Sequence, residues 1–185
     1  MTYGTRTGGY PASSKWLHWA VAACVLTTIP VSVAMNWVGG GPLQDTLFNL
    51  HKSLGILILL LMLLRLLNRL MVGAPAPDPD LARWQKAASS AVHGLLYLLL
   101  LLMSVTGYLA NSAYGAKTPF FGLFELPMII GKNEPLSEKL FAFHKYTGWL
   151  VAILVVMHIG AALQHHVIHR DNVLRRMLPR ALGGI

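Results

Sequence analysis

Cysteine and charged residues are both scarce in this sequence. The 185 residues include one cysteine, Cys24, which lies inside an apolar run. A single thiol excludes a disulfide framework and a cysteine-ligated metal cluster. Charged residues make up 12% of the chain and hydrophobic residues 55%, with a mean hydropathy of +0.54. This composition lies outside the range of ordinary soluble domains and indicates a membrane protein.

Acidic residues are the scarcer charge. Seven Asp and Glu face fifteen Lys and Arg, so the formal net charge is +8. Such a balance can indicate nucleic-acid binding, but here the basic residues flank apolar segments and no soluble domain carries them. We therefore interpret them as setting the orientation in a membrane, and we expect no nucleic-acid partner.

Four apolar segments reach the length needed to cross a bilayer. They run over residues 14–37, 50–70, 88–110 and 141–166. Lys15, before the apolar run that starts at Trp16, and Ser32-Val33-Ala34 within that run resemble a signal peptide with its cleavage site. The full span length of this segment favours a retained helix. We predict an all-α integral membrane protein, a four-helix transmembrane bundle forming a single domain over residues 1–185.

The connections between these segments differ in character. Residues 39–42 form a Gly-Gly-Gly-Pro turn, and residues 75–80 are rich in proline and aspartate. About thirty residues with three prolines join the third and fourth segments, and this connection is expected to hold a short interfacial helix that caps one membrane face.

The distribution of basic residues predicts the topology. Ten of the fifteen Lys and Arg, Arg6 among them, lie near the two termini or the connection between the second and third segments. The positive-inside rule therefore places both termini in the cytoplasm, and an even number of spans agrees. The other five lie on the opposite side: Lys52, Lys117, Lys132, Lys139 and Lys145.

Two histidines lie well inside the fourth segment. His144 and His158 are fourteen residues apart, close to four helical turns, so both rings leave one face at a separation of roughly 21 Å along the axis. Titratable groups inside spanning helices are costly and usually functional. One metal ion cannot bridge the gap, so each histidine needs a partner from another helix.

Depth in the membrane supplies those partners. His18 lies about a turn inside the first segment, at the cytoplasmic level of His158. His51 lies at the start of the second segment, at the periplasmic level of His144. Two stacked pairs result, and bis-imidazole ligation of a b haem in an apolar slot suits such pairs.

Neighbouring residues support this interpretation. The residue four positions after each of these histidines is small, which lets a porphyrin lie against the backbone: these residues are Ala22, Gly55, Gly148 and Ala162. Arg65 lies fourteen residues after His51, so it faces the interior at the cytoplasmic depth, where a haem propionate is a suitable partner.

Histidines inside spanning helices also allow roles without haem. Isolated histidines can hydrogen-bond a neighbouring helix or relay protons, and a zinc or copper site is a further alternative. His93 in the third segment is followed at the fourth position by Tyr97, which argues against axial ligation. His93 is a candidate for quinone binding or proton relay, or is a satisfied interior histidine.

The end of the fourth segment carries His165, His166 and His169. Their spacing allows an adventitious metal site, but solvation at the interface is the favoured interpretation. The arginines that follow, Arg170, Arg175 and Arg176, are expected to anchor the chain to anionic lipid.

With these residues in place, the sequence resembles the bacterial cytochrome b561 family, the di-haem b cytochromes of the inner membrane. The resemblance covers nearly the whole chain and rests on a set of motifs: Lys15-Trp-Leu-His18-Trp19, Leu50-His51-Lys-Ser-Leu-Gly55, Leu64-Arg65-Leu-Leu-Asn-Arg69, His93-Gly94-Leu-Leu-Tyr97, Phe143-His144-Lys-Tyr-Thr-Gly148, Met157-His158, and a tail from His165-His166 to Met177.

The resemblance implies two b haems with the axial pairs His18/His158 and His51/His144, and electron transfer between a periplasmic small molecule and ubiquinone. Superoxide oxidation to dioxygen is an activity of this type. Basic residues on the periplasmic side are expected to steer such an anion: Lys52, Lys117, Lys139 and Lys145.

Two hypotheses for the reaction follow. The chain is either an oxidoreductase of the superoxide:quinone type or an electron-transfer subunit serving a partner dehydrogenase or hydrogenase. A third class, a membrane scaffold without redox chemistry, predicts a colourless protein. The sequence identifies no protein partner; membrane lipid and quinone are the expected partners.

Overall fold

Four long helices dominate the computed structural model, which describes residues 8–78 and 81–185. They are α1 (Ala12–Trp37), α2 (Pro42–Val72), α3 (Arg83–Tyr114) and α4 (Glu134–Gln164). At about 1.5 Å per residue, each is long enough to cross the roughly 30 Å hydrocarbon layer. The helical membrane bundle predicted from hydropathy is confirmed.

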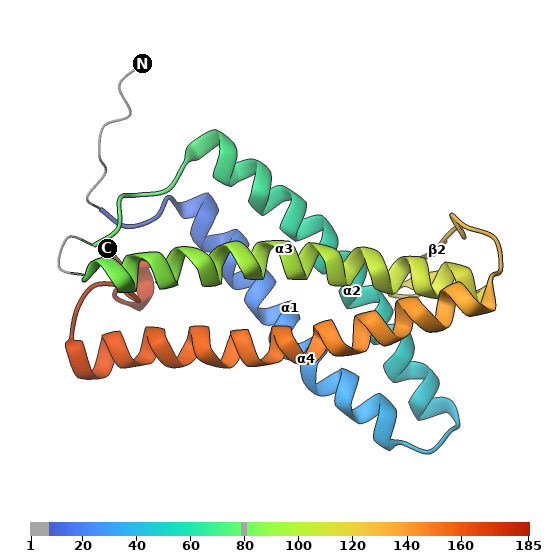
Figure 1. Cartoon of the computed structure of the whole chain (residues 1–185). Coiled ribbons are helices and arrows are strands. Elements are labelled where there is room, and N and C mark those ends of the chain that lie inside the picture. The colour runs from blue at the N-terminus through green and yellow to red at the C-terminus, as the bar shows by residue number, and fades with distance from the viewer. Residues whose placement is uncertain (1–7, 79–80) are drawn as a thin grey trace.

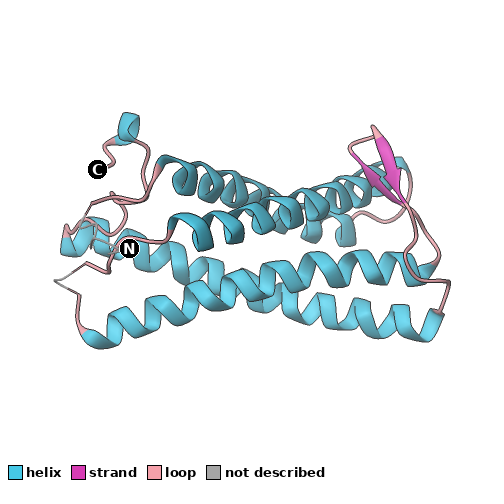
Figure 2. Ribbon diagram, turned by 90° about the horizontal axis from the view of Figure 1, so that it is seen from above, coloured by secondary structure: helices cyan, strands magenta, loops and turns pink. Residues whose placement is uncertain are grey.

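The helices pack as two antiparallel pairs. α1 packs along α2, α3 packs along α4, and α2 joins the two pairs through α3. Figure 1 shows the α1–α2 pair crossing behind the α3–α4 pair at an inclination. The chain enters α1 and leaves α4 at the same end of the bundle, as an even number of spans requires (Figure 2). Arg6 and the last two residues of the 75–80 segment lie outside the described residues.

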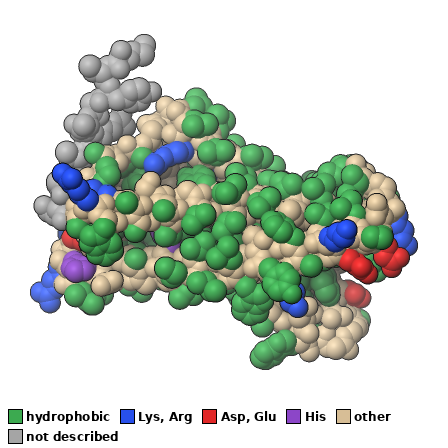
Figure 3. Space-filling view, in the orientation of Figure 1, with side chains coloured by type: hydrophobic (Ala, Val, Ile, Leu, Met, Phe, Trp, Pro, Cys, Tyr) green, Lys and Arg blue, Asp and Glu red, His purple; other side chains and the backbone are tan. Residues whose placement is uncertain are grey.

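Hydrophobic side chains cover the middle of the bundle, while most charged side chains on the visible face gather near its two ends (Figure 3). Many large apolar residues are exposed along the helices, for example Leu60, Leu98 and Val156. This pattern is that of helices whose outer surface meets lipid rather than water. The leucine-rich stretches therefore form the lipid-facing surface.

Apolar side chains also fill the interior at mid-depth. One cluster joins α1 and α2 through Val21, Val25, Ile58 and Met62, and another joins α3 and α4 around Val151. Ile58 lies seven residues after His51, and Val151 lies seven residues from both His144 and His158. The two histidine levels are therefore separated by a packed apolar layer.

The α1–α2 turn confirms the role predicted for residues 39–42. Gly40 and Gly41 have φ values of +83° and +84°, which favour glycine, and Pro42 opens α2. α2 begins eight residues before the predicted start because the polar stretch after Pro42 is helical. Hydropathy alone does not detect such an amphipathic first turn.

The predicted interfacial helix between α3 and α4 is wrong. The connection instead forms an antiparallel hairpin of β1 (Thr118–Phe120) and β2 (Phe124–Leu126), turning at Gly122 with φ +73°. The Asn111 side chain donates to the carbonyls of Ala116 and Lys117 at 2.9 and 3.2 Å, which fixes the entry to the hairpin. These bonds form a tight turn directly after α3, and the residues that follow the turn are extended rather than helical.

Two short elements close the chain. A π-helical turn, η1 (His165–His169), extends α4, and a 3₁₀ turn, η2 (Arg180–Leu182), lies near the C-terminus. Arg176 lies between them, is buried, and donates to the carbonyls of Gly8 and Ala76. Lipid anchoring, predicted for Arg176, is therefore wrong: its guanidinium ties the tail to the α2–α3 connection and to the segment before α1.

Candidate cofactor-binding site

The structure brings together the histidines that depth predicted to pair. The ring centres of His18 on α1 and His158 on α4 are 6.2 Å apart, and those of His51 on α2 and His144 on α4 are 6.1 Å apart. Each pair spans the gap between the two helix layers. The four side chains are half-buried and lie at two depths on the inner face of the bundle.

These separations suit two imidazoles on opposite sides of one metal ion. A metal–imidazole bond is about 2.0–2.1 Å, and a ring nitrogen lies about 1.1 Å from its ring centre, so the two centres would be about 6.3 Å apart. The rings of His93 and His158 are 5.3 Å apart, about 1 Å too close for that arrangement. His93 therefore contacts His158 at a separation too short for the two rings to share one metal ion in this way.

His144 is held by the backbone of α3. Its Nδ1 lies 3.0 Å from the carbonyl oxygen of Met103, which only accepts, so Nδ1 carries the proton and donates. This leaves the Nε2 lone pair for a metal ion, the arrangement that outer hydrogen bonds impose on ligand histidines. A Cβ placed on Gly107, one turn after Met103, would lie 2.8 Å from His144 Cε1.

The Nδ1 atoms of His18 and His51 are not hydrogen-bonded in the way that Nδ1 of His144 is. Nδ1 of His18 and Nδ1 of His51 are buried and have no hydrogen-bond partner among the described residues. Buried polar atoms normally find a partner. A coordinated ion can satisfy one nitrogen of each ring, so the histidine chemistry fits a bis-imidazole cofactor.

The small residues near the histidines play different parts. A Cβ placed on Gly55 would have no described heavy atom within 4 Å, so α2 presents open backbone there. At Gly148 the side chain of Met103 lies 3.3 Å from such a Cβ, so this glycine admits the α3 side chain. The porphyrin slot predicted from the small residues stays a prediction; Gly55 leaves room for one, and Gly148 is in contact with Met103 of α3.

Arg65 faces the interior at the level of His18 and His158. Its Nε donates to the hydroxyl of Tyr97 at 2.9 Å, and its guanidinium carbon lies 5.2 Å from the centre of that ring. Tyr97 therefore holds Arg65 in place by a hydrogen bond and a cation–π contact. The predicted inward direction of Arg65 agrees with the structure.

The basic residues predicted to steer an anion occupy the opposite end of the bundle. Lys117 pairs with Glu125 at 3.1 Å between exposed side chains, which compensates its charge. Lys52 is half-buried beside His51, and Lys139 and Lys145 are exposed on α4. The structure therefore leaves fewer isolated positive charges at this end than the sequence suggests.

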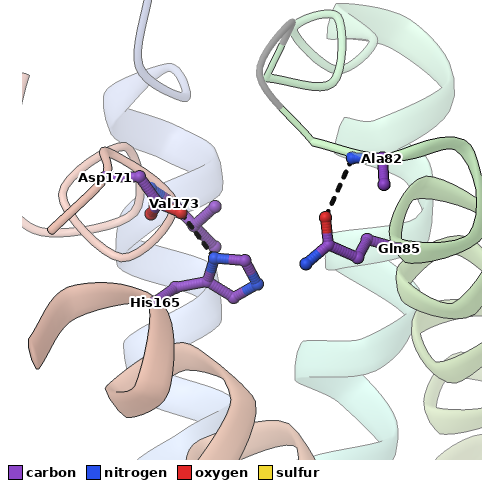
Figure 4. A network of polar contacts seen from close by, with 5 residues as sticks. All are labelled: Ala82, Gln85, His165, Asp171 and Val173. Carbon is purple, nitrogen blue, oxygen red and sulfur yellow. Dashed lines mark hydrogen bonds and ion pairs between the residues drawn. The ribbon is translucent and has the colours of Figure 1, made fainter. Parts of the chain in front are cut away.

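The histidines at the end of α4 separate into two kinds. His166 and His169 are exposed, as interfacial solvation predicts. His165 is half-buried and its Nδ1 pairs with the carboxylate of Asp171 (Figure 4). Solvation is therefore the wrong interpretation for His165. Among the described residues, no three His, Cys, Asp or Glu side chains come together as a metal site.

Sequence reasoning missed three groups that shape the site. They are the Met103 carbonyl and Gly107, which receive His144, and Ser53, whose hydroxyl accepts from Phe121 N at 2.9 Å and donates to Pro119 O at 3.2 Å. A glycine inside a spanning helix is a signal of close approach, and Gly107 carries that signal in the sequence.

Comparison with known proteins agrees with this geometry. The sequence model of the family described as prokaryotic cytochrome b561 matches residues 9–180. Cytochrome b561 homolog 2 of Escherichia coli is 31% identical, with 98% of this chain and 97% of that protein aligned. Cytochrome b561 homolog 1 of the same organism is 30% identical over 89% of this chain and 94% of its own length.

A third relative carries a functional name. A protein named probable superoxide oxidase CybB, from Yersinia pestis, is 28% identical over 90% of this chain and 94% of its own length. Given the family match over residues 9–180 and the four spanning helices, the chain belongs to the prokaryotic cytochrome b561 family of haem b-binding, multi-pass proteins of the bacterial inner membrane.

Proposed function

We propose that this chain holds two b haems, one between His18 and His158 and one between His51 and His144, and carries electrons across the membrane between a periplasmic small molecule and ubiquinone. One observation supports this most strongly: two imidazole pairs have ring centres 6.2 and 6.1 Å apart at two depths. Isolated structural histidines would have no reason to match in this way.

Each residue has a defined task in this proposal. A b haem supplies a one-electron iron couple when bound, and the protein sets its ligation and surroundings. His144 offers Nε2 because Met103 accepts from its Nδ1. Arg65, fixed by Tyr97, is placed to pair with a propionate carboxylate at the cytoplasmic level.

Superoxide is the proposed periplasmic donor. The name of the Yersinia relative supports it, and so do Lys52, Lys139 and Lys145, which lie at the hairpin end of the bundle. Positive charge near an entrance raises the local concentration of a small anion, and the effect weakens with salt. The competing candidate is an electron-transfer subunit that receives electrons from a partner dehydrogenase or hydrogenase.

The test uses the purified chain alone. A reduced-minus-oxidised spectrum with haem quantitation is expected to give two b haems per chain. Superoxide should reduce the protein, and a short-chain ubiquinone should reoxidise it. Reduction only after adding a dehydrogenase would favour the subunit role, and a colourless protein would contradict the whole proposal.

A further inference from the structure

The tail after α4 lies against the first turns of α1, at the end of the bundle where α1 begins and α4 ends (Figure 1). The backbone N–H of Tyr10 donates to Arg176 O at 2.9 Å. The buried side chain of Lys15 donates through Nζ to Ile185 O at 2.7 Å. These contacts fix the tail backbone relative to α1, so a tail carbonyl that lies between them is a fixed acceptor.

Trp19 connects this tail to His18. Its indole Nε1 donates to Met177 O at 3.0 Å. Its ring centre lies 5.2 Å from that of His18, and the two ring planes are inclined at 75°. Such an edge-to-face contact is a favoured arrangement of two aromatic rings. The indole therefore contacts the imidazole and is itself held by the tail.

His18 lacks the kind of hydrogen bond that holds His144. Its Nδ1 is buried and has no partner among the described residues, whereas Nδ1 of His144 donates to Met103 O. The orientation of the His18 ring therefore depends on packing. Trp19 lies nearer to this ring than His158 does, whose ring centre is 6.2 Å away.

Trp16, three residues before Trp19, provides a comparison on the same turn of α1. It is 74% exposed, as expected for a tryptophan of the aromatic belt at a membrane surface. Trp19 is 37% exposed, and its N–H binds a backbone carbonyl 158 positions later in the chain. Anchoring at the membrane surface does not require that bond.

We propose that Trp19 is a positioning residue for His18: the Met177 carbonyl fixes the indole, and the indole fixes the orientation of the imidazole. This rests on the proposed function, in which His18 is an axial ligand. Contacts that orient a ligand histidine strengthen its bond to the metal. The tail thus contributes to ligand geometry at the His18/His158 level, as the Met103 carbonyl does at the other level.

The test compares Trp19→Phe, which keeps an aromatic ring but removes the N–H, with Trp19→Leu, which removes both. The purified haem-loaded chain is mixed with excess apomyoglobin, and haem loss is followed by absorbance. Loss from the His18/His158 level should become about threefold faster in Trp19→Phe, because a hydrogen bond is lost, and about tenfold faster in Trp19→Leu. Trp16→Phe and Trp16→Leu are the matched controls and should lose haem at the wild-type rate.

A spectroscopic signature separates positioning from a general loss of stability. The electron paramagnetic resonance line of an oxidised b haem depends on the angle between its two imidazole planes. In Trp19→Phe the line of the His18/His158 haem should shift, while the line of the other haem stays unchanged. The His51→Ala, His144→Ala double variant, which is expected to keep only the His18/His158 haem, assigns the lines.

The shifted line is the deciding result. An unshifted line in Trp19→Phe would overturn the proposal even if haem loss were faster, since a purely structural tryptophan would give that outcome. Equal shifts at both levels, or an equal shift in Trp16→Phe, would also overturn it and leave the proposed function standing. If Trp19→Leu loses both haems, Trp19→Phe alone decides. A wild-type chain that binds no haem would overturn both.

Discussion

The His144 imidazole is fixed by two backbone features of α3. Met103 accepts the Nδ1 proton, and Gly107 removes the side chain that would otherwise occupy the ring's position. The carbonyl selects one tautomer of this ring, and the absence of a Cβ at residue 107 leaves room for its orientation, as the proposed role of His144 as a ligand requires. Neither feature can be inferred from spacing within one helix, because both lie on a neighbouring helix.

At this scale we predict that Gly107→Ala disturbs the His51/His144 level alone. The new Cβ would lie 2.8 Å from His144 Cε1, so the ring must move, at a cost of about 1–3 kcal/mol for overpacking. Haem quantitation should show partial loss of one haem, with the second spectrally unchanged. Gly160→Ala is the control, since no described heavy atom lies within 4 Å of its Cβ. Full content of both haems in Gly107→Ala would refute this role.

The elements were predictable to the extent that hydropathy determines them. Span-length apolar runs identify all four helices, because a membrane helix must satisfy its backbone internally. The hairpin was not predictable: β1 and β2 have three residues each, and Pro119 interrupts any alternation. Its position depends on Ser53 of α2, a contact between residues more than sixty positions apart.

At the scale of elements, Ser53→Ala should loosen the hairpin from α2. The change removes the acceptor for Phe121 N, together with a hydroxyl proton that Asn49 O at 2.8 Å and Pro119 O at 3.2 Å share, which should cost about 1–3 kcal/mol. Hydrogen exchange at residues 118–126 should become faster, while exchange in the helices stays as in wild type. Thr46→Ala, which loses only a bond within α2 to Pro42 O, is the control. Unchanged exchange in the hairpin would show that Ser53 does not hold it.

At the scale of the whole molecule, Arg176 connects distant parts of one membrane face. It donates to Gly8 and Ala76, which brings the segment before α1, the α2–α3 connection and the tail together. The sequence indicated only a basic tail, because it does not show which arginine is buried and which carbonyls that arginine contacts. Spacing predicted the histidine pairs better because all four lie on helices of known direction.

We therefore expect Arg176→Met to destabilise the fold by about 1.5–3 kcal/mol, because the carbonyls of Gly8 and Ala76 lose a buried, charged donor. Unfolding by sodium dodecyl sulfate titration measures this change. Arg175→Met should have a smaller effect, since Arg175 is exposed and its Nε donates to Gly183 O within the tail itself. Equal effects of the two variants would contradict the role of Arg176.

Orientation is a second property of the whole molecule. The excess of Lys and Arg near the termini and the α2–α3 connection predicts that both termini face the cytoplasm. A reporter protein that is active only in the cytoplasm should work when fused at either terminus and fail when inserted into the β1–β2 turn. The reverse pattern would place the proposed superoxide entrance on the wrong side of the membrane.

We propose that the four histidines form two independent pairs, each holding one haem. Haem content per chain in double variants tests it most directly. His51→Ala with His144→Ala, which removes one level, is predicted to retain one haem. His51→Ala with His158→Ala, which damages both levels, is predicted to retain none. One haem retained in the second variant and none in the first would contradict the pairing.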